Sequence, residues 1–87
     1  MKVYYDEFAL IHTYKRHHIE RHHIEEALSS GIEKMVYDEI HNSYIIFTNS
    51  KLAVIITNKH HLKSAFYPKA HYKYNKIRLG KIIKGGK

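Results

Sequence analysis

The stretch from Ile32 to Pro68 has the period and the turn signals of β strands. Four β-favouring runs, at residues 32–40, 44–48, 52–57 and 60–67, are separated by short polar segments rich in Asn, Ser and Lys. Connections this short permit only antiparallel neighbours, so we expect a four-strand antiparallel meander. The second and third runs contain the most Ile, Val and Phe, which predicts that they are the most buried.

The first part of the chain predicts a short strand and two helices. Residues 2–5 favour a strand, Asp6 can cap a helix over residues 7–17, and Gly31 can end a second helix over residues 20–30. Between them the five residues Arg-His-His-Ile-Glu occur twice in succession. Five residues advance a helix by about 500°, so Ile19 and Ile24 cannot share one apolar face of an unbroken helix. We therefore expect a break near His17 and His18.

This order of elements predicts an α+β fold. A chain of 87 residues suffices for one hydrophobic core. We expect a single domain over residues 1–68 with both helices on one face of the sheet, and a basic C-terminal tail over residues 69–87. The opposite face of the sheet would then be free to bind a ligand.

The tail contains the entire net charge of the protein. All eight Asp and Glu residues and eight of the fifteen Lys and Arg residues precede Lys69, and the formal net charge is +7. A basic segment with interleaved tyrosines is typical of nucleic-acid binding, because cations contact phosphates while rings stack on bases. Two other interpretations are that the tail only keeps the protein soluble and that its tyrosines pack over the sheet edge. The predicted nucleic-acid-binding residues are Lys69, His71, Tyr72, Lys73, Tyr74, Lys76, Arg78 and Lys81.

Several classes of protein do not fit the composition. The chain has no cysteine, which excludes disulfides and thiolate metal sites, and it has no apolar run long enough for a membrane helix. We expect a cytoplasmic protein without a signal peptide or membrane association. His18 and His22 have the spacing of a metal-binding pair, but the predicted helix break separates them, so we expect no metal site and no cofactor.

Two groups of residues have the chemistry of an acid–base site. His12 and Arg16 lie one helical turn apart, away from the apolar stripe of the first predicted helix. They are either a catalytic pair or part of an ordinary exposed helix face. In the last strand, strict alternation places His61, Lys63, Ala65 and Tyr67 on one face and His60, Leu62, Ser64 and Phe66 on the other. Histidines beside cations can cleave RNA without a metal, since a base activates the 2′-hydroxyl and cations stabilise the pentacoordinate phosphorus. The same strand can also be a polar sheet face without catalytic function.

One further pattern runs through roughly residues 8–68. It consists of His12, Arg16, Ile19, residues 25–28 with Gly31, and residues 64–68. In this pattern and in its order of elements the chain resembles the RelE/ParE-like toxins and the wider group of barnase-, EndoU- and colicin-like nucleases. The resemblance implies a toxin-like ribonuclease with active-site candidates His12, Arg16, Ser64 and Tyr67, and it implies an acidic antitoxin as a protein partner. In the group an Arg-Gly pair is usual at the turn between the helices, where this chain has His17 and His18.

These observations lead to one main hypothesis. We expect a toxin-type, metal-independent endoribonuclease that acts on mRNA or tRNA, with RNA held by the basic tail. The catalytic candidates are His12, Arg16, His61, Lys63, Ser64 and Tyr67. The alternatives are a non-catalytic RNA- or DNA-binding module and a protein-interaction or inhibitor protein that uses the tail against an acidic surface.

Overall fold

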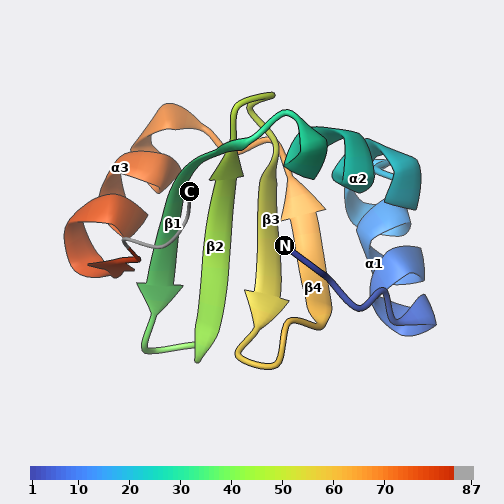
Figure 1. The fold of residues 1–87 in the computed structure, drawn as a ribbon, viewed down its shortest axis with the longest axis horizontal. Coiled ribbons are helices and arrows are strands. Elements are labelled where there is room, and N and C mark those ends of the chain that lie inside the picture. Colours follow the sequence, from blue (N-terminus) through green and yellow to red (C-terminus); the bar gives the residue numbers. More distant parts are fainter. Residues whose placement is uncertain (84–87) are drawn as a thin grey trace.

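The computed structural model describes residues 1–83. In this range the chain forms three helices and five strands, and the predicted α+β class is confirmed (Figure 1). The elements in chain order are α1 (Glu7–His17), α2 (Arg21–Ser29), β1 (Ile32–Asp38), β2 (Ser43–Thr48), β3 (Ala53–Thr57), β4 (Leu62–Phe66), α3 (Ala70–Leu79) and β5 (Lys81–Ile82). Residues 84–87 of the predicted tail lie outside the described residues.

The strands form one antiparallel sheet in the order β4-β3-β2-β1-β5. β1 to β4 are a meander in which each strand pairs with its neighbour in the chain, because the turns between them are short. β5 follows α3 and returns to the outer edge of β1, where Ile82 pairs with Val36 and Lys81 with Tyr37. Part of the segment predicted as a tail is thus a strand of the sheet.

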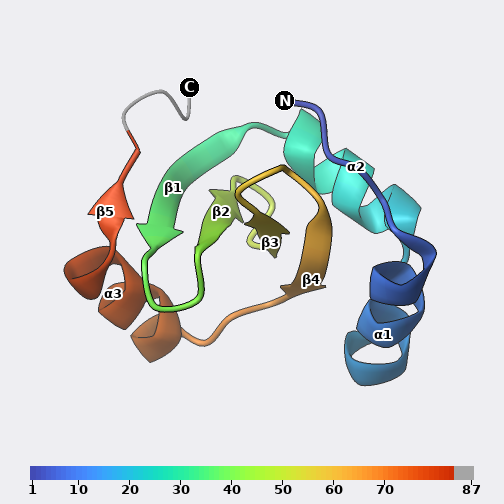
Figure 2. The same cartoon turned by 90° about the horizontal axis from the view of Figure 1, so that it is seen from below.

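The first face of the sheet supports the main core. α1 and α2 lie on the β3–β4 side, and α1 runs along β4 (Figures 1 and 2). Burial of this many apolar side chains is the main source of stability for a small domain. The buried members of this core are Val3, Ile19, Ile24, Ala27, Met35, Ile46, Leu52, Val54, Ile56, Leu62 and Ala65.

α3 covers part of the other face, near β1 and β2 (Figure 2). Its Tyr72 and Ile77 pack against a second, smaller cluster of buried residues, which are Val36, Ile45, Phe47 and Ala53. The expectation that helices occupy one face only and leave the other face free is therefore wrong. On this face β1, β2 and β3 carry apolar side chains, and α3 removes them from water.

The repeated Arg-His-His-Ile-Glu segment is divided between the first two helices. α1 ends at His17 because His18 has a left-handed backbone, with φ of 56°, and its N–H donates to the carbonyl of Tyr14 at 2.8 Å. Ile19 and Ile24 are then free to enter the same core, at 4% and 0% exposure. The start of α2 is capped by His23, whose Nδ1 accepts a hydrogen bond from the Glu20 N–H at 3.0 Å. The sequence analysis identified no such cap.

β4 departs from simple alternation. The register shifts between the pairs Ile56–Leu62 and Ile55–Ser64, so Lys63 forms a bulge that opposes no residue of β3. The bulge places Leu62 and Ala65 in the same core cluster. The predicted division of residues 60–67 into two alternating faces is therefore wrong.

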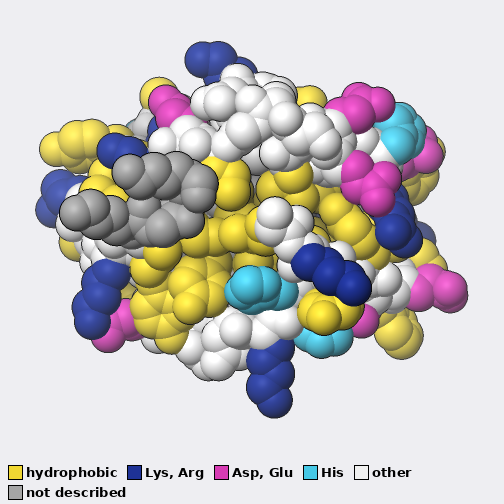
Figure 3. All heavy atoms as spheres, viewed as in Figure 1, with side chains coloured by type: hydrophobic (Ala, Val, Ile, Leu, Met, Phe, Trp, Pro, Cys, Tyr) yellow, Lys and Arg dark blue, Asp and Glu magenta, His cyan; other side chains and the backbone are white. Residues whose placement is uncertain are grey.

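The N-terminal segment makes less β structure than predicted. Tyr4 forms one parallel bridge with His61, through hydrogen bonds to the backbone of His60 and Leu62, and no longer strand is present at residues 2–5. Viewed as in Figure 1, hydrophobic side chains are visible over the central strands, and most charged side chains lie around the rim (Figure 3). Within residues 1–83 no helix is long and apolar enough to cross a membrane.

Candidate functional site

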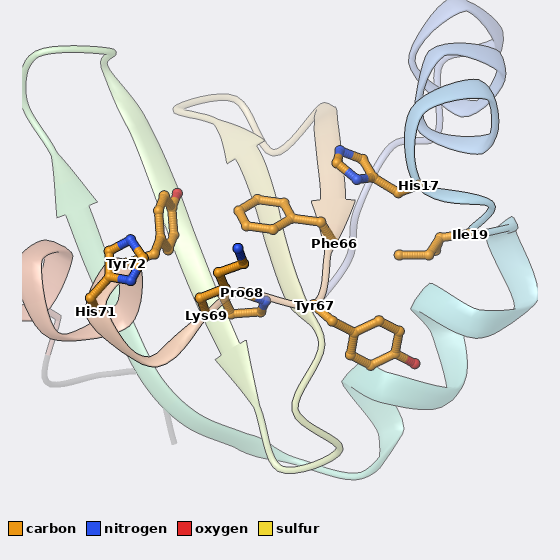
Figure 4. A pocket seen from close by; sticks show the side chains of 8 residues that line it. All are labelled: His17, Ile19, Phe66, Tyr67, Pro68, Lys69, His71 and Tyr72. Atoms are coloured by element: carbon orange, nitrogen blue, oxygen red, sulfur yellow. The ribbon is translucent and has the colours of Figure 1, made fainter.

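A hollow of about 490 Å³ lies between the end of α1 and the start of α3, and we call it the α1–α3 hollow. In Figure 4, Phe66 and Tyr67 follow each other at the end of β4 with their rings on opposite sides, His17 and Ile19 come from the side of α1, and His71 and Tyr72 come from α3. Three segments that are distant in sequence thus meet at one place. The lining residues are His17, Ile19, Phe66, Tyr67, Pro68, Lys69, His71 and Tyr72.

Aromatic contacts connect the two sides of this hollow. The His17 ring lies 5.5 Å from the Phe66 ring, and Phe66 in turn makes an edge contact with Tyr72 at 5.1 Å. Such contacts add specific geometry to the burial of the rings. The position of His17 follows from the helix end, since the left-handed turn at His18 leaves His17 as the last residue of α1, next to the end of β4.

The charge around the α1–α3 hollow favours an anion. Among the described residues its lining includes a lysine, Lys69, and two imidazoles but no Asp or Glu. Burial lowers the pKa of His17, and the nearby Arg16 and His12 lower it further. His17 is therefore neutral near pH 7 and able to accept a proton. Burial also raises the pKa of Tyr72, with a contribution from Asp38, so this phenol keeps its proton.

The structure brings together some of the predicted catalytic residues and separates others. Tyr67 lines the hollow, and Arg16 and His12 are close enough to affect His17. His61 instead contacts Asp6 at 2.9 Å and stacks on Tyr4.

The other two predicted residues of β4 also lie outside the hollow lining. The Lys63 ammonium donates to the buried Ser43 hydroxyl at 2.8 Å, and Ser64 pairs with Ile55 of β3. The spatial grouping therefore differs from the grouping that alternation predicted.

The predicted nucleic-acid-binding residues divide in a similar way. Lys69, His71 and Tyr72 line the hollow, whereas Arg78 lies over the ring of Tyr74 at 6.0 Å. Three other bases are paired with acids of β1 or of the turn that follows it. These pairs are Lys73–Glu33, Lys76–Asp38 at 2.8 Å and Lys81–Glu39 at 3.6 Å. Within residues 1–83, three of the seven tail bases that looked unopposed in the sequence thus pair with acids of the folded body.

Sequence reasoning missed His17 and Phe66. His17 was treated as part of the repeat, and Phe66 as a member of the less polar strand face. The signal for His17 was its place at the predicted helix break, because a side chain at a helix end can point into a neighbouring hollow. In the described part of the chain, no group of three His, Asp or Glu side chains is placed to hold a metal ion.

No protein-family model, curated protein or solved structure matches this chain.

Proposed function

We propose that the protein is a metal-independent endoribonuclease of the toxin type, which cleaves mRNA or tRNA in the cytoplasm at the α1–α3 hollow. The observation that carries the proposal is that two histidines and a lysine line one hollow beside stacking rings, without a carboxylate. Imidazoles supply a base and an acid near neutral pH, and the lysine attracts phosphate.

The reaction assigns one role to each polar group. Neutral His17 removes the proton of the 2′-hydroxyl, and the 2′-oxygen attacks the adjacent phosphorus. The bond from phosphorus to the 5′-oxygen breaks, and His71, as the general acid, gives a proton to that oxygen. The products are a 2′,3′-cyclic phosphate and a 5′-hydroxyl end. Lys69 and Arg16 stabilise the charge that accumulates on the phosphoryl oxygens.

The proposed relation to RelE/ParE-like toxins belongs to this proposal, and so does an acidic antitoxin as the partner. Two helices followed by an antiparallel meander agree with the order of elements on which the resemblance rests. Arg16 and Tyr67, which the resemblance implies as site residues, lie at or beside the hollow. Function depends on the site and not on the fold, so activity needs a direct test.

The test is cleavage of RNA by the purified protein in EDTA. We expect His17→Ala and His71→Ala each to lower kcat/KM by roughly 10²- to 10⁴-fold, and the cleaved RNA to end in a cyclic phosphate. His22→Ala, at an exposed histidine of α2, is the matched control and should keep full activity. Because the pKa of His17 is lowered, the rising limb of the pH–rate profile should have its midpoint below the ordinary histidine value of about 6.5.

Thermal unfolding shows whether a loss of activity is merely a loss of fold, and His17→Gln supplies a variant that keeps a polar side chain against Phe66. RNA binding without any turnover would contradict the enzyme and support the non-catalytic RNA-binding module, which the same lysine and rings favour.

A further inference from the structure

A second hollow, of about 370 Å³, lies between α3 and the end of β1 with the turn that follows it. We call it the Ile40–Leu79 hollow, and it shares His71 and Tyr72 with the α1–α3 hollow. When a phosphate of an RNA strand lies in one hollow, an adjacent nucleotide of the same strand can therefore reach the other hollow. The lining residues are Asp38, Glu39, Ile40, His71, Tyr72, Asn75, Lys76, Leu79 and Gly80.

Two large aliphatic side chains in this lining are mostly exposed. Ile40, in the turn after β1, is 88% exposed, and Leu79, the last residue of α3, is 71% exposed. They come from different elements and line the same hollow. Exposed aliphatic groups that line a hollow gain stability when a flat apolar ligand removes them from water.

The polar groups of this hollow are already held in place. One oxygen of Asp38 accepts from the Ile40 N–H at 3.1 Å, and the other accepts from Lys76 at 2.8 Å and contacts His41 at 2.9 Å. Lys76 also lies 5.6 Å from the centre of the Tyr72 ring. These contacts hold Asp38 and Lys76 in place in the lining of this hollow, beside the Tyr72 ring.

The charges of the two hollows differ. The α1–α3 hollow has Lys69 and no carboxylate among the described residues, whereas in the Ile40–Leu79 hollow Asp38 is paired with Lys76 and Glu39 with Lys81. A lining whose charges are paired in this way favours an uncharged ring over a phosphate. Asn75 adds an amide that can bond to the edge of a base.

We propose that the Ile40–Leu79 hollow binds the base of the nucleotide next to the cleaved phosphate. The inference rests on the proposed function for the position of that phosphate. It identifies the substrate as unpaired RNA, since a base can enter the hollow only when it is out of a duplex stack.

The experiment combines two changes, one in the protein and one in the RNA. The protein is wild type or the double variant Ile40→Ser/Leu79→Ser, and the RNA is a short single strand with or without one abasic ribose beside the cleaved bond. We expect the double variant and the abasic RNA each to raise KM by roughly tenfold, and their combination to raise it no further. Ile11→Ser, on α1 in the lining of a different hollow, is the matched control and should not change KM.

Additive losses of the double variant and the abasic ribose would overturn the inference, as would equal KM values for variant and wild type. The same comparison is made for binding, by fluorescence anisotropy of labelled RNA. If the wild type binds without cleaving, non-additive losses in the dissociation constant support the base site although the enzyme is disproved. If the wild type cleaves and the Ile40–Leu79 changes have no effect, the enzyme stands and the base site is disproved. Absence of both binding and cleavage overturns both.

Discussion

The face of the sheet under α1 and α2 and the face under α3 are packed in different ways. Among residues 1–83, the first face buries eleven apolar residues in one cluster, and α2 contributes Ile24 at 0% exposure. In the same range the second face buries four, and α3 itself has no fully buried residue. α3 is held by the half-buried Tyr72 and Ile77 together with ion pairs to β1.

The difference separates stability from function. The buried members of the core under α1 and α2 are apolar, so the free energy of this core comes from burial and depends little on pH or salt. The α3 face keeps its charged groups near water, and both hollows lie along α3. Acid and salt should therefore act on the α3 face first, and the predictions below test this contrast in order of decreasing effect.

The largest contrast is between one aliphatic residue of each helix. We expect Ile24→Ala to lower the free energy of unfolding by about 2–5 kcal/mol, because it leaves a cavity in the main core. Ile77→Ala removes a half-buried side chain of the same size, and its cost should be about 1 kcal/mol. Urea unfolding followed by circular dichroism measures both values. Equal losses would contradict the proposed difference between the two faces.

The local part of the fold follows from the sequence, and the long-range part does not. The strands of the meander are separated by turns whose residues are visible in the chain, so neighbouring strands determine one another. The bulge at Lys63 has no such signal, because a single extra residue is recognised only when β3 is aligned beside β4. Strict alternation therefore grouped His61 with Lys63 and Tyr67, which the structure separates.

The tail shows the same limit for charge. Lys73 and Glu33 are forty residues apart, and nothing in the spacing of either residue indicates that they pair. Because residues 69–87 contain no Asp or Glu, their positive charge looked unopposed in the sequence. In the fold, acidic residues of β1 form ion pairs with bases of α3. The lining of the candidate site overlaps in part with the predicted residues, since Tyr67, Lys69, His71 and Tyr72 line the α1–α3 hollow. His17 was not predicted, because its place in the lining depends on its contact with Phe66 in the fold.

The next effect concerns the pH dependence of the α3 face. Burial alone would raise the pKa of Asp38, but hydrogen bonds from Lys76 and His41 outweigh it and lower the pKa to about 2. A carboxyl with a lowered pKa in the folded state stabilises the protein at pH values above its unfolded pKa. That contribution is lost as the pH falls from about 4 to about 2, and it amounts to about 2 kcal/mol.

Acid titration of unfolding free energy therefore separates wild type from Asp38→Asn. We expect the wild type to be more stable at pH 7 and the gap to close by about 2 kcal/mol toward pH 2. Lys76→Met removes the main partner of Asp38 and should flatten the same region of the wild-type curve. A gap that stays constant from pH 7 to pH 2 would show that this ion pair does not stabilise the α3 face.

The prediction with the smallest effect on stability concerns Glu33, whose substitution should weaken folding slightly and strengthen RNA binding. Glu33 and Lys73 form an exposed pair, so Glu33→Gln should cost less than about 1 kcal/mol of unfolding free energy. The same change releases Lys73 to contact phosphate, and each new contact makes binding more sensitive to salt. We expect RNA to bind a few-fold tighter at low salt, with a slope of log K against log salt steeper by about 0.7.

Glu26→Gln removes the same charge from α2, outside the lining of both hollows, and serves as the control. If both variants bind RNA equally tightly, net charge alone explains the gain and Lys73 does not reach the substrate. If only Glu33→Gln binds RNA more tightly, the ion pair between Glu33 of β1 and Lys73 of α3 competes with RNA for the Lys73 ammonium.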